Sequence, residues 1–258
     1  MSTPIVGSPT VRSDPRQPRL ATWASLRWIV RHRAWTPFYL VRYWRMLKVR
    51  VRQPHIVLHG LVFLGKGVSL EAREGFGRLE IGRFVHIGDN TRVRCHEGSL
   101  RIGDKAVFGN ENTINCYLDI EFGEATLLSD WIYVCDFDHR YADVTVPIKD
   151  QGIVKSPVRI GPETWIGTKV TVLRGARVGR GCVLGAHAVV RGDVPDHAVA
   201  VGAPARVVRD RTADWEAAAA QREALADIAR KTALAAGQAA ESEGAPGTSA
   251  GEPARRPT

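Results

Sequence analysis

The sequence lacks a hydrophobic run of transmembrane length and a leader of the secretory type. Between Leu20 and Arg52 the longest uncharged run has eight residues, whereas a helix that spans a bilayer needs ~20. Residues 1–19 contain neither an apolar core nor a small-residue cleavage site, so we expect no signal peptide. These absences exclude a transmembrane protein and predict a cytoplasmic one.

Cysteine is also scarce. The four cysteines form no C-x-x-C pair and no tight cluster, and they lie at positions 95, 116, 135 and 182. This spacing argues against a disulfide scaffold and against a zinc knuckle. We therefore expect a reducing compartment and no metal.

Acidic residues are nearly absent from the first fifth of the chain. Up to Arg52, eleven Lys and Arg residues accompany a single acid, Asp14, and give this part a net charge of +10. The net charge of the whole chain is +9, so the remaining residues sum to −1. The high pI of the chain therefore comes from this one segment and not from the rest of the protein. We expect no nucleic-acid partner.

Composition divides the chain into five parts. The two ends are rich in Pro, Ser, Gly or Ala and are expected to be disordered. The parts are residues 1–19 (disordered), 20–54 (basic, aromatic and helical), 55–209 (a repeat domain), 210–236 (a short Ala-rich helix) and 237–258 (a disordered tail).

The repeat has a period of six residues. Its first place is aliphatic six times in succession, and its fifth place is always small or β-branched. The first places are Ile160, Ile166, Val172, Val178, Leu184 and Val190, and the fifth places are Thr164, Val170, Ala176, Cys182, Ala188 and Val194. Glycine follows four of the six aliphatic residues, and similar phrases occur between Ile81 and Gly123.

A period of six suits a short strand followed by a corner, with three sides closing one triangular coil. The aliphatic and small residues would point into the prism, and glycine would relieve the tight corner. Parallel strands of successive coils then stack ~4.8 Å apart. The repeat predicts an all-β, left-handed parallel β-helix, preceded by a helical segment and followed by a short helix. An ordinary β-sandwich is the alternative fold, and six exact hexads in succession argue against it.

The hexads stop once, and polar residues collect at the interruption. The frame breaks at His139 and resumes at Ile160, so residues 139–159 should leave the prism as a loop. A neutral imidazole at a corner, beside carboxylates, could serve as the general base for a hydroxyl acceptor. Counting coils places Asp119 about one strand spacing below His139, where it could orient the ring, and Asp136 and Asp138 compete for that role.

Two further phrases make a family resemblance specific. These are Trp165-Ile166-Gly167, which opens a coil, and Val201-Gly202-Ala203-Pro204-Ala205-Arg206-Val207-Val208, which closes the series. With the hexads they resemble the hexapeptide-repeat acyltransferases, which include maltose, galactoside, serine and surface-polysaccharide O-acetyltransferases. The resemblance covers about residues 60–209. The phrase Asp136-Phe137-Asp138-His139-Arg140 is closer to the polysaccharide enzymes than to the Gly-His-Pro type.

This resemblance implies an acyl-CoA-dependent O-acyltransferase, with acetyl-CoA as donor and a sugar, polysaccharide or glycolipid hydroxyl as acceptor. It implies His139 as the base, Asn115 in the acceptor pocket, and a homotrimer in which the loop of one subunit reaches the site of the next. It places the pantetheine arm beside Trp165, Gly167, Thr168 and the Gly185-Ala186 corner. Lys169 and Arg206 are candidates to meet the phosphates of the cofactor.

Two rival functions use the same coils. A gamma carbonic anhydrase needs two histidines separated by four residues, and the nearest pair, His55 and His59, is separated by three. A non-catalytic scaffold would keep the hexads but would not need Asn115, His139 and Trp165 together with a loop. Both are weaker interpretations than an acyltransferase.

Residues 20–52 mix eight cations with four Trp and two Tyr and contain no acid. Such a segment can lie in the headgroup region of an anionic membrane, with its rings buried shallowly, and would bring the enzyme to the inner face of the membrane. Alternatively, it caps the open strand edge of the first coil. The sequence favours neither, and both can hold together.

Overall fold

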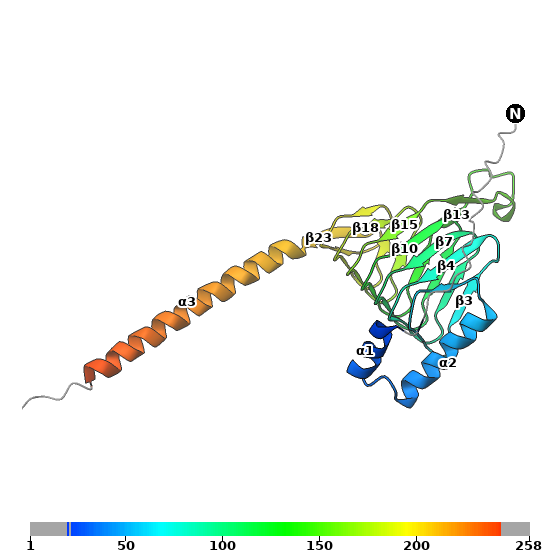
Figure 1. Ribbon diagram of the computed structural model, residues 1–258. Coiled ribbons are helices and arrows are strands. Elements are labelled where there is room, and N and C mark those ends of the chain that lie inside the picture. The colour runs from blue at the N-terminus through cyan, green and yellow to red at the C-terminus, as the bar shows by residue number, and fades with distance from the viewer. Residues whose placement is uncertain (1–19, 21, 244–258) are drawn as a thin grey trace, which may run out of the picture. The chain divides into compact units, whose positions relative to one another are not determined.

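Three parallel sheets form the sides of a prism (Figure 1). The computed structural model describes residue 20 and residues 22–243, and the chain divides into two units, Met1–Asp210 and Arg211–Thr258. Along the first unit the chain visits the three sheets in turn, so that every three strands complete one coil. This is the predicted left-handed parallel β-helix. The expected disorder of residues 1–19, and of the predicted 237–258 tail beyond residue 243, lies outside the described residues.

Each sheet is built from strands one coil apart, and we call the sheets A, B and C. Sheet A contains β1 (Val57–Leu58), β4 (Gly77–Ile81), β7 (Gly98–Ile102), β10 (Asp119–Phe122), β15 (Val158–Ile160), β18 (Arg177–Val178) and β21 (Asp193–Val194). Sheet B contains β2 (Val62–Leu64), β5 (Val85–Ile87), β8 (Val107–Phe108), β11 (Leu127–Leu128), β16 (Trp165–Ile166), β19 (Val183–Leu184), β22 (Ala198–Val201) and β23 (Arg206–Asp210). Sheet C contains β3 (Ser69–Ala72), β6 (Arg92–Cys95), β9 (Thr113–Cys116), β12 (Tyr133–Cys135), β17 (Thr171–Val172) and β20 (Val189–Val190). Among the described strands of these three sheets, only β23 runs antiparallel, along β22.

The core lies inside the prism and is made by the two repeating places of the hexad. All twelve residues predicted to point inward between Ile160 and Val194 are buried. Aromatic residues take the aliphatic place in two earlier coils, where Phe108 and Phe122 meet edge to face with ring centroids 5.0 Å apart. The sequence period therefore identified the core directly.

The glycines of the repeat have a different role from the predicted one. In Gly161 and Gly167 the backbone has no positive φ, but a Cβ atom would lie 2.5 Å and 2.8 Å from backbone atoms of the next coil. The left-handed conformation falls two residues later, at Glu163 (φ 58°) and Lys169 (φ 57°). Glycine is thus required for close stacking of coils, and the left-handed residue two positions later makes the tight turn.

The predicted loop begins earlier than the hexad count indicated. The chain leaves the prism after Cys135 and forms an antiparallel pair, β13 (Phe137–His139) with β14 (Ile153–Lys155). A short 3₁₀ helix, η1 (Ile148–Asp150), lies in the connection. We call this segment, residues 136–157, the excursion; His139 therefore lies within it and not at the prism corner.

Two helices, α1 (Trp23–Arg31) and α2 (Pro37–Arg52), cover the first coil (Figure 1). The α1 helix begins where the Thr22 hydroxyl accepts the Ser25 amide at 3.1 Å, and α2 begins at a proline, which suits the first helical position. Met46 of α2 is buried, and its sulfur accepts the Val62 amide at 3.3 Å. The helices therefore cap the prism, as one of the two predicted interpretations requires.

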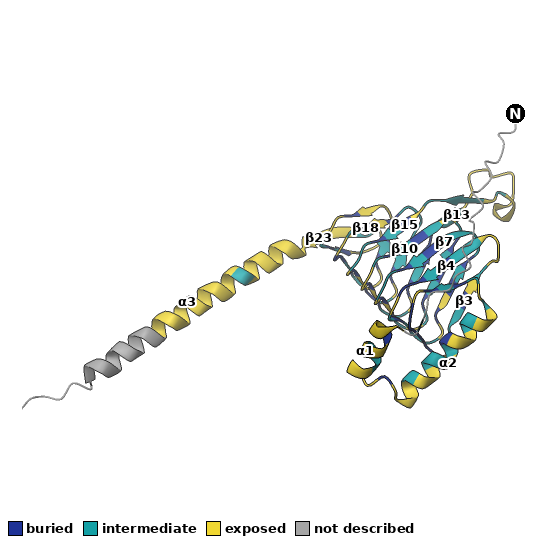
Figure 2. Cartoon of the chain, viewed as in Figure 1, coloured by how far each residue is buried: buried dark blue, intermediate teal, exposed yellow. Residues whose placement is uncertain are grey.

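The second unit contains α3 (Arg211–Glu243). The sequence predicted a short helix that ended at residue 236, but α3 has 33 residues and continues to Glu243. Residues 238–243 consist mainly of Gln, Ala and Glu, which are good helix formers, so the Gly237 position does not end the helix. Of its apolar side chains, Trp215, Leu225 and Ile228 are exposed. The part of α3 that is coloured by burial is almost entirely exposed (Figure 2).

Candidate active site

His139 lies at the rim of a cavity of about 840 Å³ on the excursion. Its side chain is exposed, and it makes no hydrogen bond with any other described residue. The cavity is lined mainly by polar and charged side chains, which are Asp138, His139, Arg140, Tyr141, Asp143, Asp150, Gln151 and Arg174, together with Ala142, Val146 and Val154. The imidazole is therefore accessible to a ligand in this cavity.

A row of aromatic rings leads to His139 along the corner where sheet C meets sheet A. His96 stacks on Tyr117 with ring centroids 4.6 Å apart, and Tyr117 meets the edge of Phe137 at 4.6 Å. Phe137 in turn meets His139 edge-on at 6.3 Å. We call His96, Tyr117 and Phe137 the aromatic row. Because each ring comes from a successive coil, the row runs parallel to the prism axis and ends at the predicted base.

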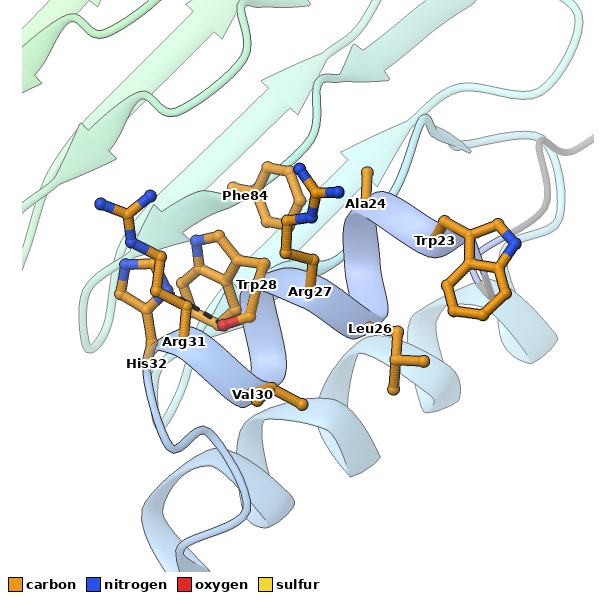
Figure 3. A pocket seen from close by; sticks show the side chains of 9 residues that line it. All are labelled: Trp23, Ala24, Leu26, Arg27, Trp28, Val30, Arg31, His32 and Phe84. Carbon is orange, nitrogen blue, oxygen red and sulfur yellow. Dashed lines mark hydrogen bonds between the residues drawn. The ribbon is translucent and has the colours of Figure 1, made fainter.

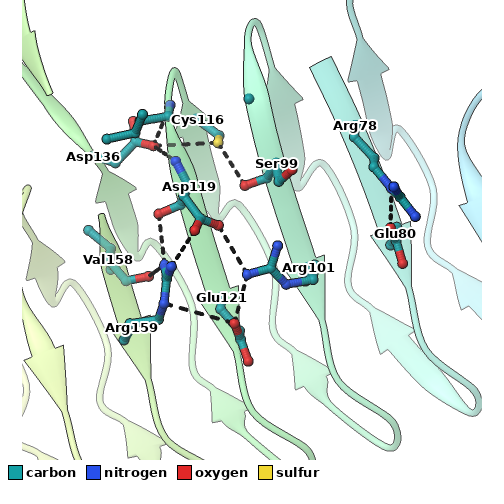
Figure 4. Close-up of polar contacts among 12 residues, drawn as sticks. Arg78, Glu80, Ser99, Arg101, Cys116, Asp119, Glu121, Asp136, Val158 and Arg159 are labelled. Atoms are coloured by element: carbon teal, nitrogen blue, oxygen red, sulfur yellow. Dashed lines mark hydrogen bonds and ion pairs between the residues drawn. The ribbon is translucent and has the colours of Figure 1, made fainter. Parts of the chain in front are cut away.

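Asp136 is buried and holds the turn below it (Figure 4). Its carboxylate accepts backbone amides from Tyr117 at 2.8 Å, Leu118 at 2.8 Å and Asp119 at 2.7 Å. The Cys116 thiol also donates to it, at 3.4 Å. All four of these donors belong to residues 116–119 and none to His139. The Asp136 carboxylate therefore stabilises this turn and does not orient the imidazole.

Asp138 is the carboxylate beside His139 that faces the same cavity. It forms an ion pair of 2.6 Å with Arg174, which lies between β17 and β18 in the coil above. About a third of each side chain is exposed, 32% and 29%. This ion pair joins the beginning of the excursion to the prism, next to His139.

Asp119 does not lie one coil below His139, which corrects the sequence-based expectation. Simple counting holds up to Cys135, which pairs with Asn115, but the chain then leaves the prism. The strand above β10 is β15, so Ile120 pairs with Val158, and the Asp119 carboxylate pairs with Arg101 and Arg159 (Figure 4). His139 lies in the antiparallel pair outside the prism, so it does not stack over Asp119.

Asn115 lies on β9, directly below the last prism residue before the excursion. Its side-chain amide donates to the Tyr133 hydroxyl at 3.4 Å, and both side chains are partly exposed on the outer face of sheet C. Burial and neighbouring acidic groups raise the pKa of Tyr133, so its hydroxyl stays protonated. Asn115 is therefore near the start of the excursion but does not line its cavity.

The predicted cofactor residues gather at a different corner, where sheet B meets sheet C. Trp165 is half exposed, and its ring nitrogen donates to the Ser129 hydroxyl at 3.3 Å. The Thr168 hydroxyl donates to the Asp130 carbonyl at 2.9 Å. Gly167 stacks closely on the Gly185-Ala186 corner of the next coil, with room for no Cβ. In a single chain these residues and His139 belong to different corners.

The two predicted phosphate ligands come from different parts of the chain. The Lys169 ammonium lies 5.6 Å from the centre of the Trp131 ring, one coil below at the same corner as Trp165. Arg206 lies in β23, is exposed, and donates to the Ala205 carbonyl at 3.0 Å. Arg206 pairs with Val201, whose side chain lies over Gly185, so both candidates lie near the corner of the other cofactor residues. Trp131, which is 57% exposed, joins them.

Sequence reasoning missed Arg174, Tyr117 and Trp131. Arg174 and Trp131 occupy corner places of their hexads, and nothing in the local sequence pattern marks them. The sequence did contain a pattern that predicts the place of Tyr117. His96, Tyr117 and Phe137 are aromatic residues spaced by about one coil, so their rings can stack along one corner.

The four cysteines are buried, and no pair of them forms a disulfide. A hydrogen bond with Cys95 and burial raise the pKa of Cys116, and burial raises the pKa of Cys135 and of Cys182. Among residues 20 and 22–243, no group of three or more His, Cys, Asp or Glu side chains could hold a metal ion. Within the same range, no helix is long and apolar enough to cross a membrane.

Comparison with known proteins agrees with this architecture. Residues 157–192 match the family described as bacterial transferase hexapeptide (six repeats). A solved galactoside acetyltransferase in complex with coenzyme A is 23% identical over 56% of this chain and 64% of that chain, with a TM-score of 0.40.

Curated relatives are more similar. A protein of Escherichia coli named as a lipopolysaccharide biosynthesis O-acetyl transferase is 32% identical over 45% of this chain and 68% of its own length. A protein of Mycobacterium tuberculosis named as a probable acetyltransferase is 62% identical over 85% of this chain and 75% of its own length. With these relatives and its hexads, the chain belongs to the bacterial hexapeptide-repeat transferase family and is an acyltransferase.

Proposed function

We propose that the protein transfers an acetyl group from acetyl-CoA to a hydroxyl group of a sugar, polysaccharide or glycolipid, with His139 as the general base. The observation that carries the proposal is the position of His139 at the rim of the excursion cavity, with its ring free of hydrogen bonds to the rest of the described chain. A base must be free to accept a proton from the substrate. Two relatives are named as acetyltransferases, which supports acetyl-CoA as the donor.

Direct transfer suits this site. His139 removes the proton of the acceptor hydroxyl while that oxygen attacks the thioester carbonyl of acetyl-CoA. Collapse of the tetrahedral intermediate breaks the carbon–sulfur bond, and the departing thiolate takes up the proton from the imidazolium. Buried cysteines with raised pKa values are poor nucleophiles, which supports a mechanism without a covalent acyl-enzyme.

The aromatic row supports a carbohydrate acceptor. Tyr117 and Phe137 are partly exposed, Phe137 lies next to His139 and Tyr117 next to Phe137. Flat aromatic faces pack well against the apolar faces of sugar rings. The polar lining of the cavity, which includes Asp143, Asp150 and Gln151, offers hydrogen bonds to sugar hydroxyls. The relative named for lipopolysaccharide biosynthesis favours the same class of acceptor.

A homotrimer would bring the separated halves of the site together. The outer face of sheet B carries an exposed apolar ladder of Val107, Leu127 and Trp165, paired in register across three coils. The outer face of sheet A instead carries a ladder of alternating charge, Glu80, Arg101, Glu121 and Arg159. Packing of sheet B against a neighbouring subunit would cover the apolar ladder and place the Trp165 corner of one chain near the His139 cavity of another.

Mass spectrometry of the product tests the proposed activity. Purified protein is incubated with acetyl-CoA and a panel of sugars, oligosaccharides and glycolipids, and the products are searched for the added mass of one acetyl group. We expect an ester product with at least one carbohydrate acceptor. Acetylation of amines alone would assign the enzyme to N-acyl transfer, and an absence of both CoA binding and CoA release would favour a scaffold.

A further inference from the structure

The helices α1 and α2 carry a second apolar face that does not pack against the prism. On α1, Trp23, Leu26 and Val30 are exposed at positions i, i+3 and i+7. On α2, the exposed residues at i, i+4, i+7 and i+11 are Leu40, Trp44, Leu47 and Val51. We call these seven residues the outer face; Trp23 is 85% exposed, Val51 72% and Trp44 66%.

The opposite sides of the same helices already fulfil the capping role. Trp28 of α1 stacks on Phe63 and Phe84 with centroids 4.7 Å and 5.4 Å away, and Tyr43 and Met46 of α2 turn to the first coil. The outer face is therefore not needed to cover the strand edge. Its regular helical spacing nevertheless forms a continuous apolar stripe on each helix, and such stripes mark interaction surfaces.

A groove of about 840 Å³ lies along α1, and three residues of the outer face, Trp23, Leu26 and Val30, line it (Figure 3). The rest of its lining includes the aromatic rings of Trp28 and Phe84 and the side chains of Arg27, Arg31 and His32. An apolar floor with cations at its border matches the chemistry of a lipid, whose hydrocarbon and phosphate need these two environments side by side.

The charge around the outer face is of one sign. Five exposed cations belong to these helices or their connections, and none of them forms an ion pair within the part of the chain that the structure describes; they are Arg27, Arg31, Arg33, Lys48 and Arg52. The sequence has no Asp or Glu between residues 15 and 70. A partner of this face must therefore supply negative charge.

We propose that the outer face docks the protein on an anionic lipid bilayer, with α1 and α2 lying in the headgroup region. Exposed tryptophans favour this region, and each nearby cation adds electrostatic attraction to anionic lipid. A second copy of the chain is a poor occupant, because a symmetric contact would bring two acid-free, basic faces together. Docking would bring the transferase to acceptors that are held on a membrane.

Vesicle flotation of the full-length protein tests this docking without acetyl donor or acceptor, so its outcome is independent of the proposed activity. We expect the protein to float with vesicles of phosphatidylglycerol and phosphatidylcholine and to remain at the bottom with phosphatidylcholine alone. Arg27→Gln should weaken binding about fivefold, as loss of one surface cation predicts. Trp44→Ser should weaken it about tenfold through lost apolar burial.

Two matched variants serve as controls, because they change exposed residues of the same types elsewhere. Arg191→Gln and Trp215→Ser should bind vesicles as the unchanged protein does. Equal binding to neutral vesicles, or equal losses in the control variants, would overturn the assignment to an anionic bilayer. Failure to float with either vesicle, or a smaller oligomer on Trp44→Ser, would show that this face is not a membrane surface.

Discussion

The Arg174 guanidinium lies 2.6 Å from the Asp138 carboxylate, and this pair joins the excursion to the coil above it beside His139. The two residues are 36 positions apart in the chain. Since Asp138 immediately precedes His139, the pair limits how the ring can move relative to the prism. We propose that Arg174 acts as a positioning residue for the base.

Replacing Arg174 with Ala should therefore lower turnover about tenfold while changing thermal stability little, because a partly exposed ion pair contributes only about 1 kcal/mol or less. Acetyl transfer at saturating substrate and a thermal melt measure the two effects. Arg174→Lys, which keeps the charge, should recover part of the rate. A variant with unchanged turnover would show that the pair does not position His139.

The proposed role of His139 predicts a larger effect. His139→Ala should lower turnover ~10²-fold or more, because the acceptor hydroxyl loses its base. CoA binding and the melting temperature should change little, since the side chain is exposed and has no hydrogen bond within the described chain. His59→Ala, which removes another exposed histidine, is the matched control and should keep its activity. Retained turnover in His139→Ala would contradict the assignment.

Asp136 should affect folding more than chemistry. Asp136→Asn replaces one of the two oxygens that accept three backbone amides, and it turns an NH₂ group toward those donors. We expect a loss of about 2 kcal/mol or more in the free energy of unfolding, measured by urea denaturation. Asp138→Asn, at a partly exposed site, should cost about 1 kcal/mol or less. If Asp136→Asn is as stable as the unchanged protein, the structural role is wrong.

His86 predicts a pH dependence of stability. It stacks on Phe63 with centroids 4.3 Å apart, and burial, with smaller effects of Arg42 and His32, lowers the pKa of His86 from 6.5 to about 4. The unfolded chain therefore takes up a proton on this residue at higher pH than the folded protein does. Its contribution to stability is complete above pH 6.5 and is lost as the pH falls toward 4.

The measurement compares urea midpoints of the unchanged protein and His86→Phe at several pH values. Other groups also titrate in this range, so the difference between the two proteins isolates His86. We expect the midpoint of the unchanged protein to fall more steeply with acid than that of the variant. Parallel curves would show that His86 does not have the lowered pKa.

The exposed ladder on sheet B predicts the oligomeric state. Sedimentation should give about three times the chain mass of 28.3 kDa, and Leu127→Asp should reduce it to the monomer by placing a charge within the apolar ladder. Phe76→Asp, at an exposed aromatic outside sheet B, is the control and should stay assembled. A monomeric, fully active native protein would contradict a site shared between subunits.

Much of the fold follows from the sequence because the hexad is a local constraint. Each aliphatic and small place points inward whatever the rest of the chain does, so Ile160 through Val194 could be assigned to the core without any long-range information. The break in the hexads likewise located the excursion and His139. The cationic segment at residues 20–52 and its helical character were also visible in composition and spacing.

The neighbours of His139 were decided by tertiary structure. Counting hexads assumes that each coil follows the last, and the excursion breaks that assumption, so Asp119 meets Arg159 of the next coil while Asp138 meets Arg174. Likewise, only packing on β2 shows which side of α2 caps the prism and which side, with Trp44 and Val51, stays exposed. A repeat determines which residues point inward, but the contacts between side chains on the outside depend on register across coils, and one insertion shifts that register.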